Sequence, residues 1–211
     1  MLWLSASLLL GGVVFGLIKF SNNESNQTAL LINTISSSDS DWVKGAKDAQ
    51  VVLVEYSDFQ CPACAFYFSL LKQLDQEFSN KIQFIYRHFP LKQIHVNAES
   101  AAWAAEAAGR QGKFWEMHDM IFENQATWSS QKNTEDIFLS YAQSLGLNSN
   151  QFKIDFDSNE VKEKVTNDYA GGIESEVNAT PTFFLNGQKI KNPSNYDEFR
   201  NIIKEAIDSN S

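Results

Sequence analysis

Residues 51–64 read VVLVEYSDFQCPAC, and this stretch decides the fold. Its first part, Val51 to Val54, is a β-branched apolar run that predicts a strand buried on both faces and ending near Ser57. From Cys61 the pattern becomes helical, and Pro62 lies in the first turn, where its missing N–H costs nothing. Apolar residues then recur at helical spacing, at Phe66, Leu70, Leu71, Leu74 and Phe78.

A second strand is predicted at residues 82–86, where the run IQFIY is followed by a stop at Pro90. A strand, a helix and a strand with a crossover of this length predict a parallel pair. The Gly171-Gly172 pair is expected to kink or end the last helix of the segment that follows. Five helices are expected in that segment, at residues 96–110, 113–123, 134–145, 151–156 and 160–176.

Strands return near the carboxyl end of the chain. Asn186-Gly187 is a strong hairpin signal and joins the predicted strands 182–185 and 188–190. Ser194 and Asp197 resemble a capping box and predict a final helix that runs through Ala206. The order β-α-β, helices, β-β-α predicts an α/β fold in which a helical insertion at about residues 93–160 separates two halves of a small sheet.

Cys61 and Cys64 stand one helical turn apart, directly after the buried strand. The first N–H groups of the helix favour the Cys61 thiolate, so its pKa is expected below the free value of about 8.5. The pair is therefore predicted to combine an exposed nucleophile with a buried resolving thiol. A C-x-x-C alone could be half of a metal site, but between a strand and a helix it indicates redox chemistry.

The metal alternative is weak because zinc would need two more ligands. His88, His95 and His118 do not form the short paired spacing of a zinc module, so no metal site is predicted. These histidines are interpreted as packing or surface residues.

Two further positions carry candidate roles. Glu55 lies inside the apolar strand, where burial would raise its pKa and let it exchange a proton with Cys64; the alternative is an exposed glutamate at the strand end. Pro181 follows Thr180 at the start of a strand and is either plain punctuation or a cis residue. In the cis form, a peptide edge beside Cys61 could hold a substrate chain as an added strand.

The residues from Glu55 to Cys64 (EYSDFQCPAC) resemble the active-site strand and helix of the DsbA-like thiol–disulfide oxidoreductases. The resemblance continues through RHFPL (87–91), IHVNA (94–98), QGKFWEMHDMIFENQ (111–125) and NATPTFFLNG (178–187). It implies a thioredoxin fold with a helical insertion, a redox-active Cys61–Cys64 disulfide and a buried acid at Glu55. It also implies that Thr180-Pro181 is the cis-proline loop. The dipeptide Pro62-Ala63 departs from the best-known oxidases, which have histidine at the second position.

Composition and charge exclude several other classes of function. The chain has 211 residues and a net charge of −9, which argues against nucleic-acid binding. Its two cysteines exclude a disulfide-dense scaffold and a four-cysteine zinc site. All of its thiol chemistry must therefore take place at Cys61 and Cys64.

The amino-terminal segment sets the expected compartment. Residues 2–18 carry no charge, and as a helix they would rise about 25 Å, near the lower limit for a bilayer core. Residues 1–20 are expected to be a signal anchor or a signal peptide, and the lack of an A-x-A site favours the anchor. Residues 21–40, rich in serine and asparagine, are expected to be a flexible linker, with the domain at 41–211.

The sequence thus predicts an exported, membrane-tethered thiol–disulfide oxidoreductase on the extracytoplasmic side of the membrane. It would introduce disulfides into cysteine-containing exported proteins, without an organic cofactor, and a membrane or soluble redox partner would reset the pair. An exported disulfide reductase or isomerase is the first alternative. A tethered peptide- or metal-binding module without enzyme activity is the second.

Overall fold

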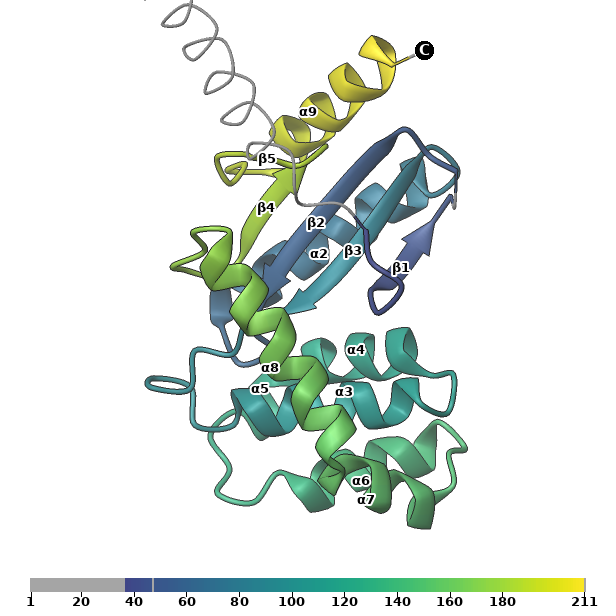
Figure 1. Cartoon of the computed structure of the whole chain (residues 1–211), viewed down its shortest axis with the longest axis vertical. Coiled ribbons are helices and arrows are strands. Elements are labelled where there is room, and N and C mark those ends of the chain that lie inside the picture. Colours follow the sequence, from purple (N-terminus) through teal and green to yellow (C-terminus); the bar gives the residue numbers. More distant parts are fainter. Residues whose placement is uncertain (1–36, 47, 211) are drawn as a thin grey trace, which may run out of the picture. The chain divides into compact units, whose positions relative to one another are not determined.

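The structure is a computed structural model that describes residues 37–46 and 48–210 (Figure 1). The predicted anchor and residues 21–36 of the predicted linker lie outside the described residues. Within the described part, no helix is long and apolar enough to cross a membrane.

Five strands form one mixed sheet with the order β1-β3-β2-β4-β5. Strand β2 is parallel to β3, while the pairs β1–β3, β2–β4 and β4–β5 are antiparallel. The predicted α/β thioredoxin-like fold is confirmed, including the parallel pair and the carboxyl-terminal hairpin. The strands are β1 (Trp42–Gly45), β2 (Val51–Ser57), β3 (Ile82–His88), β4 (Thr182–Leu185) and β5 (Gln188–Lys189).

Strand β2 is central and buried because its apolar run is covered on both faces. Helices α2 (Pro62–Phe78) and α9 (Tyr196–Ser209) share one hydrophobic cluster with it, in which Leu53 packs with Leu74 and Phe199. Phe66, which the helical pattern placed with the apolar residues of α2, is half exposed. The hairpin turn is as predicted, with positive φ at both Asn186 and Gly187.

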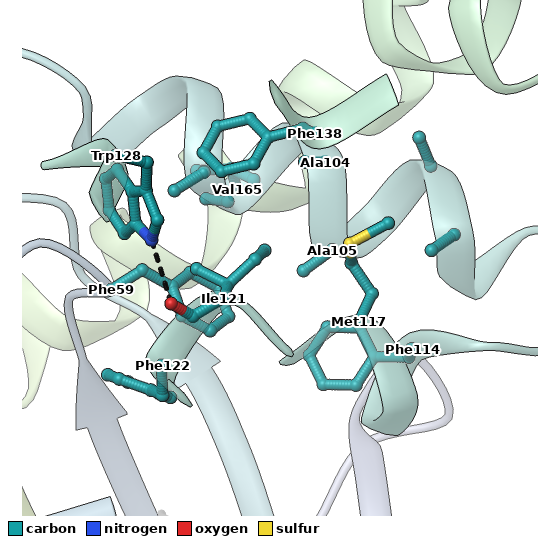
Figure 2. Close-up of a cluster of buried hydrophobic side chains, with 14 of the residues drawn as sticks. Phe59, Ala104, Ala105, Phe114, Met117, Ile121, Phe122, Trp128, Phe138 and Val165 are labelled. Atoms are coloured by element: carbon teal, nitrogen blue, oxygen red, sulfur yellow. Dashed lines mark hydrogen bonds between the residues drawn. The ribbon is translucent and has the colours of Figure 1, made fainter. Parts of the chain in front are cut away.

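Six helices connect β3 to β4, and α3, α4 and α5 lie beyond the carboxyl ends of β2 and β3 (Figure 1). Their core is an alanine-rich α3 packed against aromatic side chains of its neighbours (Figure 2). Trp128 is fully buried there and donates its indole N–H to the Ile121 carbonyl at 2.8 Å. The helices are α3 (Ala98–Gly109), α4 (Phe114–Glu123), α5 (Gln125–Trp128), α6 (Glu135–Ser144), α7 (Ser149–Asp157) and α8 (Asn159–Glu174).

Helix α8 continues through Gly171 and Gly172 to Glu174, so the expected end at the glycine pair is wrong. The glycines serve packing instead: a Cβ on Gly172 would lie 2.5 Å from a ring carbon of Phe89 and 3.1 Å from the Tyr56 ring. The absence of a side chain lets α8 approach the sheet closely.

The start of α9 is also shifted by one residue. Asn195 is the N-cap and its side chain accepts from the Glu198 N–H at 3.0 Å, so the capping pair is not Ser194 and Asp197.

Candidate active site

Cys61 directly precedes α2, and Cys64 lies in its first turn, after the turn that follows β2. Both lie at the end of the sheet that faces the helices between β3 and β4. Cys61 is the N-cap residue of α2, and Pro62 follows it in the first turn as predicted. Both side chains are free thiols and belong to the hydrophobic cluster that joins the sheet to the helices. Cys64 is fully buried and Cys61 is 7% exposed, so Cys61 is less accessible than the sequence suggested.

The surroundings of Cys61 favour its thiolate and lower its pKa to about 5. A hydrogen bond from the Cys64 thiol is the largest cause, and burial opposes it. The Thr180 side chain and the backbone N–H groups of Cys64 and Ala63 lower the pKa further. The predicted direction is confirmed, but the helix N–H groups contribute less than the partner thiol does.

Cys64 behaves in the opposite way. Burial raises its pKa well above the ordinary thiol value, and the neighbouring Cys61 and Glu55 charges raise it further. The Asp58 N–H points at the Cys64 sulfur from 3.5 Å. At neutral pH the pair therefore consists of one thiolate and one thiol, which is the unequal division of roles that exchange chemistry requires.

Glu55 is 2% exposed in the middle of β2, so the reading as an exposed strand-end glutamate is wrong. Burial raises the pKa of its carboxyl to about 8, with the Ser57 hydroxyl lowering it and Cys61 raising it. Glu55 also raises the pKa of the buried Tyr86 hydroxyl, after burial itself. A carboxyl with this pKa is mostly protonated at neutral pH and can give up or accept a proton near that pH.

The Thr180-Pro181 peptide bond is cis. It directly precedes β4, which pairs antiparallel with β2 beside the active site, with Tyr56 opposite Thr182. The Cys61 sulfur lies 3.5 Å from the Thr180 carbonyl oxygen, which accepts a hydrogen bond from Cys61 when its thiol is protonated. The structure thus brings Cys61, Cys64 and the Thr180-Pro181 loop together, although 119 residues separate Cys61 from Thr180.

One group at the site was missed by the sequence analysis. The buried Asp58 carboxylate accepts from the Gln60 N–H at 2.7 Å and the Leu91 N–H at 2.8 Å, and it bonds to His95 Nδ1 at 2.7 Å. Gln60 in turn accepts from the Asn97 N–H at 2.7 Å. These bonds fix the turn before Cys61 to the loop after β3. An aspartate two residues before a backbone donor is a recognisable turn signal that could have indicated this.

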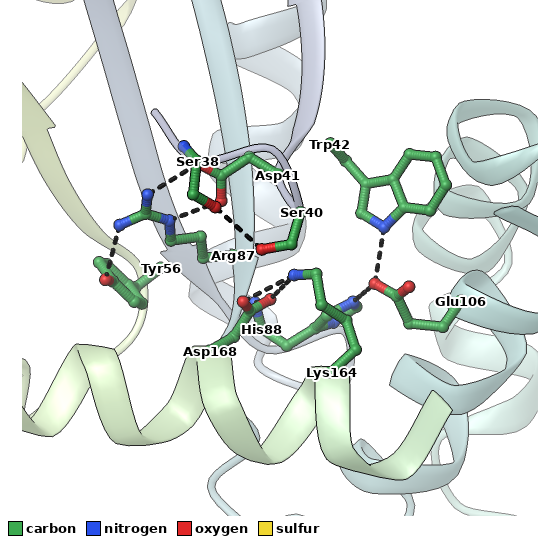
Figure 3. A network of polar contacts seen from close by, with 10 residues as sticks. All are labelled: Ser38, Ser40, Asp41, Trp42, Tyr56, Arg87, His88, Glu106, Lys164 and Asp168. Atoms are coloured by element: carbon green, nitrogen blue, oxygen red, sulfur yellow. Dashed lines mark hydrogen bonds and ion pairs between the residues drawn. The ribbon is translucent and has the colours of Figure 1, made fainter. Parts of the chain in front are cut away.

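A second polar network ties the sheet to α3 and α8 (Figure 3). Its first part is an ion pair between Arg87 and Asp41, in which Arg87 also donates to the Tyr56 hydroxyl at 3.1 Å. In the second part, Glu106 accepts from Trp42 at 2.7 Å and bonds to His88 at 2.8 Å. His88 is thus a packing histidine, as the sequence analysis expected.

The described part of the chain holds no group of three or more histidine, cysteine, aspartate or glutamate side chains placed to bind a metal ion. Of the three histidines, His88 and His118 are buried and His95 is mostly buried, so none of them is a plain surface residue.

The fold and the site define a thioredoxin-fold protein with a C-x-x-C pair at the start of its first long helix. A family profile described as thioredoxin matches residues 37–205, and the chain belongs to this family. In structure it is similar to BdbD from Bacillus subtilis in its oxidised form, at 25% identity and a TM-score of 0.73, over 82% of this chain and 95% of that one. It has the fold of Wolbachia pipientis alpha-DsbA1, at 18% identity and a TM-score of 0.75, over 84% and 96%. The resemblance to DsbA-like oxidoreductases is thereby confirmed.

Curated relatives are much longer than this chain. It is 36% identical over 169 residues to a protein of Salinispora arenicola named Na(+)/H(+) antiporter NhaA 1, a match that covers 80% of this chain and 25% of the relative. A protein of the same name from Mycolicibacterium vanbaalenii is 40% identical over 159 residues, covering 74% and 25%. The chain therefore spans about a quarter of the length of these relatives.

Proposed function

We propose that the chain is a thiol–disulfide oxidoreductase that introduces disulfides into other proteins. The observation that carries the proposal is the unequal pair, in which the Cys61 pKa is lowered to about 5 and the Cys64 pKa is raised. Cys61 is the nucleophile, Cys64 is the resolving thiol and Glu55 is the buried acid. The edge at Thr180-Pro181 binds the substrate chain beside Cys61.

The acidity of Cys61 supports the oxidising direction. A nucleophile with a pKa of about 5 is ionised at pH 7, and this stabilises the reduced pair. When the reduced pair is more stable, the oxidised pair takes electrons from substrate thiols more readily, which is why a low thiol pKa accompanies strong oxidants such as DsbA. If the nucleophilic thiol had an ordinary pKa, the reduced pair would be less stable and would favour reduction of substrates instead.

The proposed reaction moves two electrons from the substrate to the pair. A substrate thiolate attacks the Cys61 sulfur of the oxidised pair, so the Cys61–Cys64 bond breaks and a bond from Cys61 to the substrate forms. Cys64 leaves as a thiolate and takes a proton from Glu55. The second substrate thiolate then attacks the bridged substrate sulfur, which forms the substrate disulfide and releases Cys61 as a thiolate. A redox partner removes the two electrons.

We also propose that residues 2–18 anchor the protein in a membrane and place the domain on the extracytoplasmic side. The uncharged apolar run supports this placement. The occurrence of a similar domain in chains named Na(+)/H(+) antiporters fits a domain that works beside a membrane. Cysteine-containing exported proteins are the proposed substrates.

The direction is tested by mixing the oxidised full-length chain with a reduced, unfolded protein that forms a single disulfide. The expected result is one substrate disulfide for each chain consumed, with two new thiols on the chain detected by alkylation and mass spectrometry. The pre-reduced chain is the control. Faster reduction of an oxidised substrate by the pre-reduced chain would instead support the reductase, and exchange in neither direction would exclude the enzyme.

A further inference from the structure

A pocket of the domain is lined in part by the buried residue Glu55. Its lining includes Glu55 on β2 and both His118 and Asp119 on α4. Two of the lining side chains are charged and partly exposed: Lys44 (34% exposed) and Asp75 (30% exposed) form an ion pair at 2.9 Å. The other lining residues are mostly apolar, such as Leu53, Phe68, Leu74, Trp115 and Phe122.

The pocket has room for water. It offers about 30 Å³ to the centres of water-sized molecules. One water molecule needs roughly 10–15 Å³ by this measure, and it also needs polar partners. Glu55, His118 and Asp119 line the pocket and carry polar groups of this kind.

His118 is a buried histidine with one occupied nitrogen and one free nitrogen. It is 5% exposed and is enclosed by the rings of Phe59, Tyr86 and Phe122. Its Nδ1 bonds to the Asp119 carboxylate at 2.8 Å, whereas its buried Nε2 has no hydrogen-bond partner among the described residues. A buried polar atom without a hydrogen-bond partner lowers the stability of the fold, so packing alone does not explain a histidine at this position.

We propose that His118 and Asp119 relay protons between Glu55 and solvent through water in this pocket. The inference rests on the proposed function, because Glu55 must regain the proton that it gives to Cys64. From the sequence, His118 was expected to be a packing or surface residue. The relay instead gives it a role in proton transfer at the active site.

The charges around His118 suit a relay. Burial lowers the pKa of its ring, while Asp119 raises it and Lys44 on β1 and His88 on β3 lower it. The ring is therefore neutral at pH 7, with the Nδ1 proton donated to Asp119 and Nε2 left as an acceptor. Burial raises the pKa of the Asp119 carboxyl, which is 30% exposed, but the hydrogen bond from His118 and the charges of Lys44 and, on α2, Lys72 outweigh burial, so the pKa is lowered and the group stays ionised.

The proton balance is simple. When the Cys61–Cys64 bond is broken by a substrate thiolate, Cys64 takes the Glu55 proton and leaves a Glu55 carboxylate. To restore the Glu55 proton, a ring that holds its proton on Nε2 gives it to Glu55 through pocket water, while Nδ1 takes up a proton that Asp119 has received from solvent. The ring then holds its proton on Nδ1, bonded to Asp119, which is its form beside the free thiols of the reduced pair. The reverse sequence carries the proton out when the pair is oxidised again. No net charge stays on the relay after either half of the cycle.

The relay is tested by the rate at which Glu55 titrates, not by exchange activity. The reduced full-length chain is jumped from two pH units below the Glu55 pKa of about 8 to two units above it. Loss of the protonated carboxyl band is followed by time-resolved infrared spectroscopy, and Glu55→Gln identifies the band. His118→Gln is expected to slow this loss by about 10- to 100-fold, as expected for removal of an acid–base group, without changing its final amplitude.

Two further variants make the test decisive. His88→Gln is the matched control, because His88 is also buried but its Nε2 is already bonded to Glu106; it should titrate Glu55 at the wild-type rate. Asp119→Asn keeps an acceptor for Nδ1 but removes the acid, so it should also slow the loss, and it covers the case in which His118→Gln does not fold. A wild-type rate in His118→Gln or Asp119→Asn, or equal slowing in His88→Gln, would overturn the relay. Absence of exchange in the refolding assay would overturn the proposed function separately.

Discussion

Cys61→Ser is expected to abolish disulfide exchange, while Cys64→Ser accumulates mixed disulfides with substrate. The Cys61 pKa of about 5 means that roughly 99% of this thiol is ionised at pH 7. A serine hydroxyl at the same place is neither ionised nor able to form a bond to sulfur. Cys64 is fully buried and its pKa is raised, so it cannot replace Cys61 as the attacking group.

The two variants form a matched pair for one measurement. Each reduced variant is mixed with a disulfide-containing substrate, quenched with acid and run on a non-reducing gel. Cys64→Ser should give a covalent complex with one substrate molecule, and Cys61→Ser should give none. Complex formation by Cys61→Ser at a comparable rate would contradict the assignment of the nucleophile.

Glu55→Gln is expected to stabilise the fold by about 3 kcal/mol at pH 7 while slowing exchange. The folded protein holds this carboxyl protonated up to a pKa of about 8, whereas the unfolded chain releases the proton near 4.5. Below pH 4.5 the Glu55 carboxyl is protonated in both the folded and the unfolded state, so it takes nothing from the unfolding free energy of the wild type. As the pH rises from 4.5 to 8 the folded state alone retains the proton, so wild-type stability falls by about 1.4 kcal/mol per pH unit. Glutamine carries no such penalty.

The measurement is urea unfolding of the wild type and Glu55→Gln at several values between pH 4.5 and pH 8. The difference in unfolding free energy should be near zero at the acidic end and grow with pH. Glu99→Gln is the control, since the Glu99 side chain is 37% exposed and pairs with Lys92 at 3.3 Å; its effect should be within about 1 kcal/mol at every pH. A Glu55→Gln difference that does not depend on pH would contradict the raised pKa.

Much of the fold could be predicted because its signals are local. The buried run of β2, the helical spacing of α2 and the Asn186-Gly187 turn each specify their own element. Strand β1 was missed because its four residues, Trp42–Gly45, alternate between half-buried and exposed positions at an edge of the sheet. Such a strand is defined by its pairing with β3 and leaves almost no pattern of its own.

The chemistry of the site could be predicted from the sequence, but the burial of its side chains could not. Cys61 appeared exposed because the sequence does not show that the loop at Thr180 folds over it. His118 had a detectable signal: it lies four residues after Phe114 and four before Phe122, on the apolar stripe of α4. That spacing indicates burial. Its unpaired nitrogen and its position in the Glu55 pocket depend on tertiary structure, which no pattern within α4 contains.

The most direct test of the account is the redox potential of the full-length chain, measured at pH 7 by equilibration with glutathione buffers. Relative to thioredoxin, at about −270 mV with a nucleophile pKa of about 7, a Cys61 pKa of about 5 alone makes the potential roughly 50 mV less negative. The account therefore predicts a reversible two-electron transition at about −220 mV or above. A potential at or below that of thioredoxin, or no reversible transition, would contradict it.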